Sequence, residues 1–117
     1  MVLFVDDDAD LLEMIGLLFK QFKVSHVLAR SLAAVQALGD QVQDITTAIL
    51  DVNLGPGQPT GVAVAKWLQE RNRRVRIHFL TGHAADHPLV VEASHNGEVM
   101  AKPFDTRKLV DIARNSP

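Results

Sequence analysis

The chain has 117 residues, of which 47% are hydrophobic and 22% charged, and its formal net charge is −2 at pH 7. This length suits one domain, and this composition excludes a disordered chain. The small net charge gives no general attraction to nucleic acid or to an anionic membrane, so neither is expected as a direct partner. The absence of cysteine excludes disulfides, a thiol nucleophile and thiolate metal sites. No signal peptide and no apolar run of roughly 18 to 20 residues is present, so a cytoplasmic location is expected.

Short apolar runs alternate with amphipathic stretches from one end of the chain to the other. The runs predict strands buried on both faces, at residues 1–5, 24–29, 46–50, 75–80 and 99–101. Apolar residues at helical spacing predict a helix after each run, with the following members: Leu11, Leu12, Ile15, Leu18, Phe19 and Phe22 in the first; Leu32, Val35 and Leu38 in the second; Val62, Ala65 and Leu68 in the third; residues 88–94 as the fourth; Leu109, Val110, Ile112 and Ala113 in the fifth.

Polar residues mark the predicted ends of these helices. Asp8 or Asp10 is expected to cap the first helix, Ser31 the second, and Asp105 or Thr106 the last, because short polar side chains accept from the free amides of a first turn. Gly39 is expected to end the second helix. Alternating strands and helices predict a doubly wound α/β domain, with a five-stranded parallel sheet flanked by five helices.

Four of the predicted strands end in a polar side chain. Asp6 and Asp7 follow the first strand, Asp51 the third, Thr81 the fourth and Lys102 the fifth. A single aspartate at a strand end is more often a turn former or a helix cap. Four matched positions instead predict one site, because ligands of open α/β sheets bind beyond the carboxyl ends of the strands.

The chemistry of these side chains favours phosphoryl transfer. Three carboxylates held together repel one another unless a cation neutralises them. An oxygen-only set of ligands favours a hard ion such as Mg²⁺. The metal and an ammonium can hold phosphoryl oxygens, a hydroxyl can donate to another, and a carboxylate can attack the phosphorus.

The sequence resembles the response-regulator receiver domain of two-component signalling over essentially its whole length. The resemblance rests on four motifs, at residues 3–7 (LFVDD), 49–54 (ILDVNL), 80–82 (LTG) and 102–104 (KPF). It implies a flavodoxin-like fold, with residues 1–117 as a single receiver domain. It also implies that Asp51 is the phosphoacceptor and that a histidine kinase or a histidine phosphotransfer protein supplies the phosphoryl group.

The resemblance also assigns roles to the remaining strand-end residues. Asp6 and Asp7 are expected to bind Mg²⁺ together with Asp51 and the backbone carbonyl of Asn53. Thr81 and Lys102 are expected to contact the phosphoryl group. The peptide bond between Lys102 and Pro103 is commonly cis in this family.

Two features depart from the family pattern. The loop from residue 55 to 61 is about two residues longer than usual, which is expected to alter the edge of the site. Val99 occupies a position that often carries an aromatic residue coupled to the strand-end threonine, and the chain has no tyrosine. His83, two residues after Thr81, borders the predicted site, and we expect it to influence water access to a phosphorylated Asp51. A metal site at His83 and His87 is disfavoured, because Gly82 and Pro88 place them in a loop.

The resemblance implies a phosphorylation-dependent switch rather than an enzyme, and two alternatives stay open. One is a receiver-like scaffold that binds a partner without being phosphorylated. The other is a Mg²⁺-dependent phosphohydrolase with an aspartate nucleophile, which usually needs an acid where this chain has Asn53. The short termini favour a receiver excised from a longer regulator or hybrid kinase with an attached output or kinase domain. The sequence is also compatible with a homodimer.

Overall fold

The computed structural model describes residues 1–115 and confirms the predicted alternation of strands and helices. The strands are β1 (Val2–Val5), β2 (His26–Ala29), β3 (Thr47–Asp51), β4 (Arg76–Thr81) and β5 (Glu98–Ala101). The helices are α1 (Ala9–Gln21), α2 (Leu32–Gln36), α3 (Gly61–Arg71), α4 (Pro88–Ser94) and α5 (Thr106–Arg114), and a 3₁₀ helix, η1 (Gly39–Asp44), follows α2. No helix among residues 1–115 is long and apolar enough to cross a membrane.

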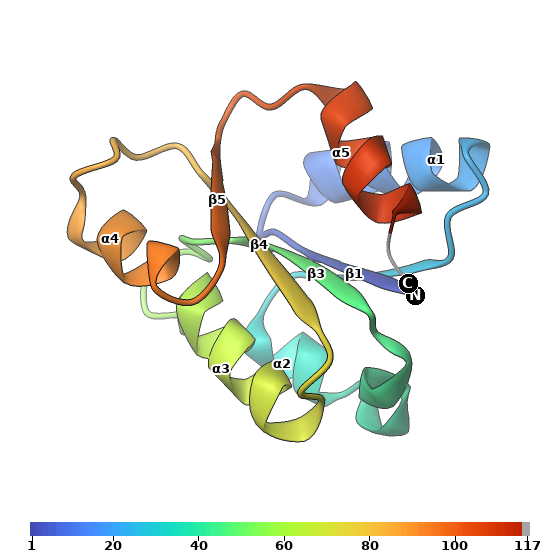
Figure 1. The fold of residues 1–117 in the computed structure, drawn as a ribbon, viewed down its shortest axis with the longest axis horizontal. Helices are drawn as coiled ribbons and strands as arrows, with labels where there is room; N and C mark the ends of the chain where they lie inside the picture. The colour runs from blue at the N-terminus through green and yellow to red at the C-terminus, as the bar shows by residue number, and fades with distance from the viewer. Residues whose placement is uncertain (116–117) are drawn as a thin grey trace.

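The five strands form one parallel sheet in the order β2-β1-β3-β4-β5, of which Figure 1 labels β1, β3, β4 and β5. This order confirms the predicted doubly wound, flavodoxin-like fold. The chain runs outward from β1 to β2 and then returns past β1 to β3, so the direction of winding reverses between β1 and β3. A crevice for ligands opens at such a reversal, beyond the carboxyl ends of the two strands.

Helices cover both faces of the sheet and create two apolar cores. Helices α1 and α5 lie over one face, and α2, α3 and α4 lie over the other (Figure 1). All four residues of β1 are buried, with Val2 and Phe4 in the first core and Leu3 and Val5 in the second. Two covered faces explain why the strands read as continuous apolar runs in the sequence.

All three predicted helix starts are defined by hydrogen bonds, and Ser31 caps α2 as expected, its Oγ accepting from the Ala34 amide at 3.2 Å. The Asp8 carboxylate accepts from the backbone amides of Asp10 and Leu11, so Asp8 rather than Asp10 caps α1. The Asp105 carboxylate accepts from the Arg107 amide and caps α5. These caps satisfy amides that have no partner inside the helix.

The second helix ends earlier than predicted. Helix α2 stops at Gln36, and Gly39 begins η1 with φ +58° instead of ending the helix. Val42 and Ile45 are buried in this segment, and the Asn72 side-chain amide donates to both of their carbonyl oxygens, at 3.1 and 2.7 Å. The 3₁₀ turn therefore follows from tertiary packing and from a polar anchor distant in sequence.

The first helix also differs from its predicted stripe at the last position. Helix α1 ends at Gln21, and Phe22 is its C-cap. The Phe22 side chain is 42% exposed, so it does not join the core with Ile15 and Phe19. Lys23 follows with φ +57°, which turns the chain away from the helix axis.

Candidate functional site

The predicted carboxylates meet at the point where the strand order reverses. Asp6 follows β1 and Asp51 ends β3, and these two strands are hydrogen-bonded neighbours. Oxygen atoms of Asp6, Asp7 and Asp51 all lie within 4.8 Å of one another. Asp6 is 1% exposed and Asp51 is 7% exposed, whereas Asp7 is open to solvent. The result is an acidic cluster with two buried members and one accessible member.

Lys102 reaches this cluster from the end of β5. Its Nζ donates to Asp6 Oδ2 at 2.8 Å and lies 3.3 Å from Asp51 Oδ2. The second oxygen of Asp6 accepts from the Asp8 backbone amide at 2.9 Å. Asp6 is therefore held on both oxygens, and Lys102 bridges the two buried acids. The peptide bond from Lys102 to Pro103 is cis, as predicted.

The crowding of charges changes the acidity of the site. Burial first, and then the neighbouring Asp6 carboxylate, raise the pKa of Asp51 from 3.8 to about 6, against the opposing effect of Lys102. Burial alone would lower the pKa of Lys102, but its hydrogen bond to Asp6 and the negative charges of Asp51 and Asp6 outweigh that effect and raise it. Lys102 thus stays charged, and the cluster keeps an excess of negative charge.

The donor set fits a divalent cation of the hard type. Three carboxylates face a single ammonium, so a cation would offset both the repulsion and the cost of burying Asp51. Mg²⁺ binds carboxylate oxygens and keeps several waters, and the exposed side of Asp7 leaves room for them. Beside the cluster opens a cavity of about 440 Å³. It is lined by Asp7, Asp51, Asn53, Gly55, Pro56, Gly82, His83 and Lys102.

Asn53 lies in this cavity through a tight turn after β3. Its backbone amide donates to Asp51 Oδ1 at 3.4 Å, and its side-chain oxygen accepts from the Gly55 amide at 3.0 Å. Both bonds use groups other than the Asn53 carbonyl. The resemblance implies that carbonyl oxygen as the fourth protein ligand of the metal.

Thr81 is tied to the same region through the sheet. It is the last residue of β4 and is 3% exposed. Its carbonyl accepts from the Lys102 amide at 2.7 Å, and its Oγ1 accepts from the His83 amide at 3.0 Å. The hydroxyl proton of Thr81 remains available to a further acceptor.

The long loop between β3 and α3 builds one wall of the cavity. Gly55 and Pro56 line it. Gly55 has φ +106°, and a Cβ there would lie 3.3 Å from Asp7 Oδ2. At the end of the loop, a Cβ on Gly61 would come within 2.9 Å of the Asp51 carbonyl carbon. Glycine at both positions lets the loop approach the acids closely.

One feature of the site was not predicted, namely the pairing of two histidine rings at its rim. His83 lines the cavity, and its ring stacks on that of His87 with centroids 4.1 Å apart and planes 15° apart. Their spacing of four residues is visible in the sequence. The stack itself depends on the path of an irregular loop, which the spacing does not determine.

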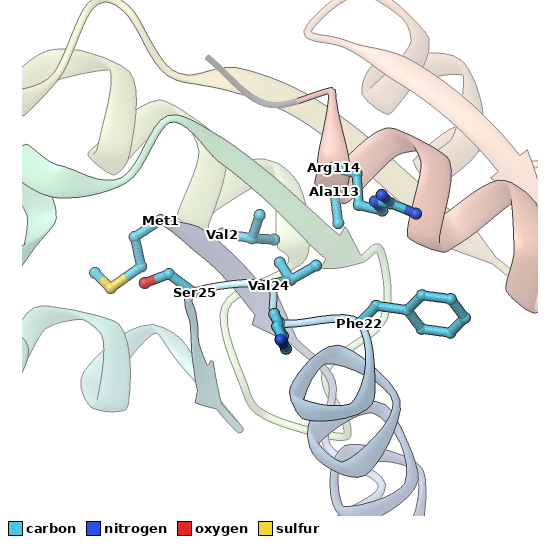
Figure 2. Close-up of a pocket in the computed structure, with 8 residues that line it drawn as sticks. Met1, Val2, Phe22, Val24, Ser25, Ala113 and Arg114 are labelled. Carbon is cyan, nitrogen blue, oxygen red and sulfur yellow. The ribbon is translucent and has the colours of Figure 1, made fainter.

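A second hollow lies at the opposite end of the sheet and plays no part in this chemistry. Figure 2 shows it beside the start of β1, with Val2, Val24 and Ala113 facing one another. Its volume is about 380 Å³, and its charged side chains, Lys23 and Arg114, are basic. None of the residues that line it carries a carboxylate that could bind a metal.

Comparison with known proteins gives a family match and many structural matches. The chain matches the response regulator receiver domain over residues 2–114. A receiver domain protein from Clostridium thermocellum superposes with a TM-score of 0.82 at 19% identity, covering 98% of this chain and 91% of that one. NtrX from Brucella abortus, solved with ATP, gives 0.80 at 19% identity and covers 98% of this chain but 26% of its own.

A third structural match carries a modified site. A response regulator from Burkholderia pseudomallei, solved with a phosphorylated aspartic acid, a calcium ion and citrate, gives a TM-score of 0.72 at 20% identity. The match covers 97% of this chain and 66% of that one. At these identities the structural matches show the fold alone. No curated protein matches the sequence.

Together with the family match, the parallel α/β fold and its acidic cluster identify a signalling switch rather than an enzyme. The chain belongs to the response-regulator receiver domain family of two-component systems, as its match over residues 2–114 shows. Receiver domains of this family partner with histidine kinases, and the acidic cluster is consistent with their divalent metal site.

Proposed function

We propose that residues 1–117 form one receiver domain in which Asp51 accepts a phosphoryl group from a histidine kinase or a histidine phosphotransfer protein. The observation that carries this proposal is the position of Asp51. Its carboxylate is buried at the carboxyl end of β3, yet it lines an open cavity and lies 3.3 Å from the Lys102 ammonium. Asp6 also contacts Lys102, at 2.8 Å, but it does not line the cavity, and Asp7 lines the cavity but is exposed.

The proposed step is a transfer between two residues. An oxygen of the Asp51 carboxylate attacks phosphorus, an O–P bond forms, and the P–N bond to the donor histidine breaks. The imidazole leaves with the bonding electron pair and takes up a proton. Water later attacks the same phosphorus, which restores the Asp51 carboxylate and releases inorganic phosphate.

The neighbouring side chains prepare this step by fixing charge. Asp6, Asp7, Asp51 and the Asn53 carbonyl would hold Mg²⁺, which when bound offsets negative charge on the phosphoryl oxygens. Lys102 is positioned by its 2.8 Å bond to Asp6 to hold another of these oxygens. Thr81 would donate its hydroxyl proton to a third. The phosphorylated site would then differ from the unphosphorylated site in the hydrogen-bond partners of Thr81 and Lys102. That difference would be the signal.

The proposed partners follow from the family. A cytoplasmic histidine kinase or phosphotransfer protein would supply the phosphoryl group. The structural match to NtrX covers 26% of that longer chain, so an attached output or kinase domain is also proposed for the protein that carries this receiver.

Mass spectrometry tests the proposal directly. The protein is incubated with acetyl phosphate and Mg²⁺, and the gain of one phosphoryl mass is localised by fragmentation. We expect a hydroxylamine-sensitive modification on Asp51 that is absent in Asp51→Asn and present in Asp8→Asn. Asp8 is a matched control, because it is exposed and asparagine also caps helices.

The same experiment separates the alternatives. Unmodified wild-type protein, with unchanged partner binding in Asp51→Asn, would instead support a scaffold that works without phosphate. Repeated release of phosphate from an aryl phosphate ester, without any kinase, would support a phosphohydrolase. Either result would refute the assignment of Asp51 as an acceptor for signalling.

A further inference from the structure

The segment between β4 and α4 is closed by its two histidines. The His83 amide donates to Thr81 Oγ1 at 3.0 Å, and the His83 ring stacks on His87 at 4.1 Å. The residues between them, 84–86, are exposed. The His87 amide donates to the Ala84 carbonyl at 3.0 Å, and the ring contact adds a side-chain link between the end of β4 and the start of α4.

His87 also fixes the first turn of α4. Its Nδ1 accepts from the Leu89 amide at 3.2 Å, and its carbonyl accepts from the Val90 amide at 2.9 Å. The helix has only seven residues, and its buried residues are Val90 and Ala93. A helix this short depends on its cap and on a few packing contacts, so a displaced His87 would displace its first turn.

The other end of the link touches the proposed phosphorylation site. His83 lines the cavity that Asp51 and Lys102 also line. Oxygen atoms of a phosphoryl group on Asp51 would attract the Thr81 hydroxyl. Turning that hydroxyl changes the bond that Thr81 Oγ1 accepts from the His83 amide, and the His83 ring moves with its backbone.

We propose that the stacked rings of His83 and His87 couple the acidic cavity to α4, so that loading the cavity repositions the first turn of that helix. This inference rests on the proposed function, because the loaded state is phosphorylated Asp51. Aromatic stacking is directional, so two stacked rings pass on a change of orientation that aliphatic side chains would absorb.

Nuclear magnetic resonance of the ¹⁵N-labelled domain tests the coupling. Beryllofluoride with Mg²⁺ serves as the phosphoryl mimic, and amide shift changes are compared at residues 81–83 and at residues 89–93. His87→Asn keeps a side-chain oxygen for the cap and removes the ring. His95→Asn is the matched control, because His95 is exposed at the other end of α4.

We expect the wild type and His95→Asn to respond at both segments. His87→Asn should keep the response at residues 81–83 and lose more than half of it at residues 89–93. His83→Ala leaves the cap of α4 intact and should show the same loss at residues 89–93, which guards against local unfolding in His87→Asn.

A full α4 response in both ring variants would overturn the coupling and leave the proposed function standing. Absence of any response at residues 81–83 in the wild type would refute the proposed function, and the coupling with it. The two failures are therefore distinguishable in a single set of spectra.

Discussion

Replacing Asp51 with asparagine should stabilise the metal-free protein at neutral pH. Burial and the Asp6 carboxylate raise the pKa of Asp51 from 3.8 to about 6 in the folded chain. Between these two values the folded state binds more protons than the unfolded state. The free energy of unfolding therefore falls as the pH rises from about 4 to about 6, and the full cost of ionising Asp51 applies above that window.

The size of the effect follows from the shift in pKa. A change from 3.8 to about 6 corresponds to about 3 kcal/mol at roughly 1.36 kcal/mol per pKa unit. Asparagine keeps the shape but weakens the contact with Lys102, which costs about 1 kcal/mol. The variant should thus gain about 2 kcal/mol at pH 7.5 and gain nothing at pH 4, where the folded protein already carries a protonated Asp51.

Urea unfolding followed by the fluorescence of Trp67, the single tryptophan, measures this difference. Trp67 packs against the core and lies under the Arg71 guanidinium at 4.0 Å, so its signal reports tertiary structure. Asp86→Asn, at an exposed loop position, serves as a control and should change stability by less than about 0.5 kcal/mol. The reasoning would be refuted if Asp51→Asn were no more stable than the wild type at pH 7.5, or if its difference in the free energy of unfolding were the same at both pH values.

Three further perturbations probe the same region. Lys102→Ala should lower the free energy of unfolding by about 2–4 kcal/mol in metal-free buffer, because two buried carboxylates lose their counter-ion; an unchanged urea midpoint would contradict this. Mg²⁺ at about 100 times its dissociation constant should stabilise the wild type by about 3 kcal/mol, and at the same concentration Asp7→Asn should gain clearly less; equal gains would remove Asp7 from the metal site. Gly61→Ala should destabilise the fold by more than about 3 kcal/mol, because its Cβ would collide with the Asp51 carbonyl, whereas Gly82→Ala meets open space and should cost less than about 1 kcal/mol by thermal unfolding.

The alternation of strands and helices was predictable because burial on both faces leaves a direct mark on the sequence. Each strand of a covered parallel sheet is apolar at successive positions, and the acid after β1 and the acid that ends β3 stop those runs abruptly. Segment η1 left no such mark. Val42 is its one buried residue, and the bond that supports its carbonyl comes from Asn72, at the end of α3. A single apolar residue cannot show the spacing that predicts a helix. A hydrogen bond from a residue distant in sequence leaves no recognisable pattern within the segment itself.

The candidate site likewise has one part that was predictable from the sequence and one part that was not. The cluster of Asp6, Asp7 and Asp51 was predictable from topology, since adjacent parallel strands deliver their ends to one edge. The cavity wall at Gly55 and Pro56 and the stack of His83 on His87 were not. Both depend on how irregular segments fold back, which is decided by turn geometry and packing rather than by residue spacing.

The close approach of Gly61 to the backbone at Asp51 holds α3 firmly against β3. The Gly61 amide donates to the Val52 carbonyl at 2.9 Å, and the lack of a side chain lets α3 rest directly on the backbone of the acceptor strand. Strain that arises at Asp51 cannot relax in that direction without breaking main-chain contacts. In the proposed phosphorylated state, we therefore expect the displacement to run across the sheet toward β4 and α4.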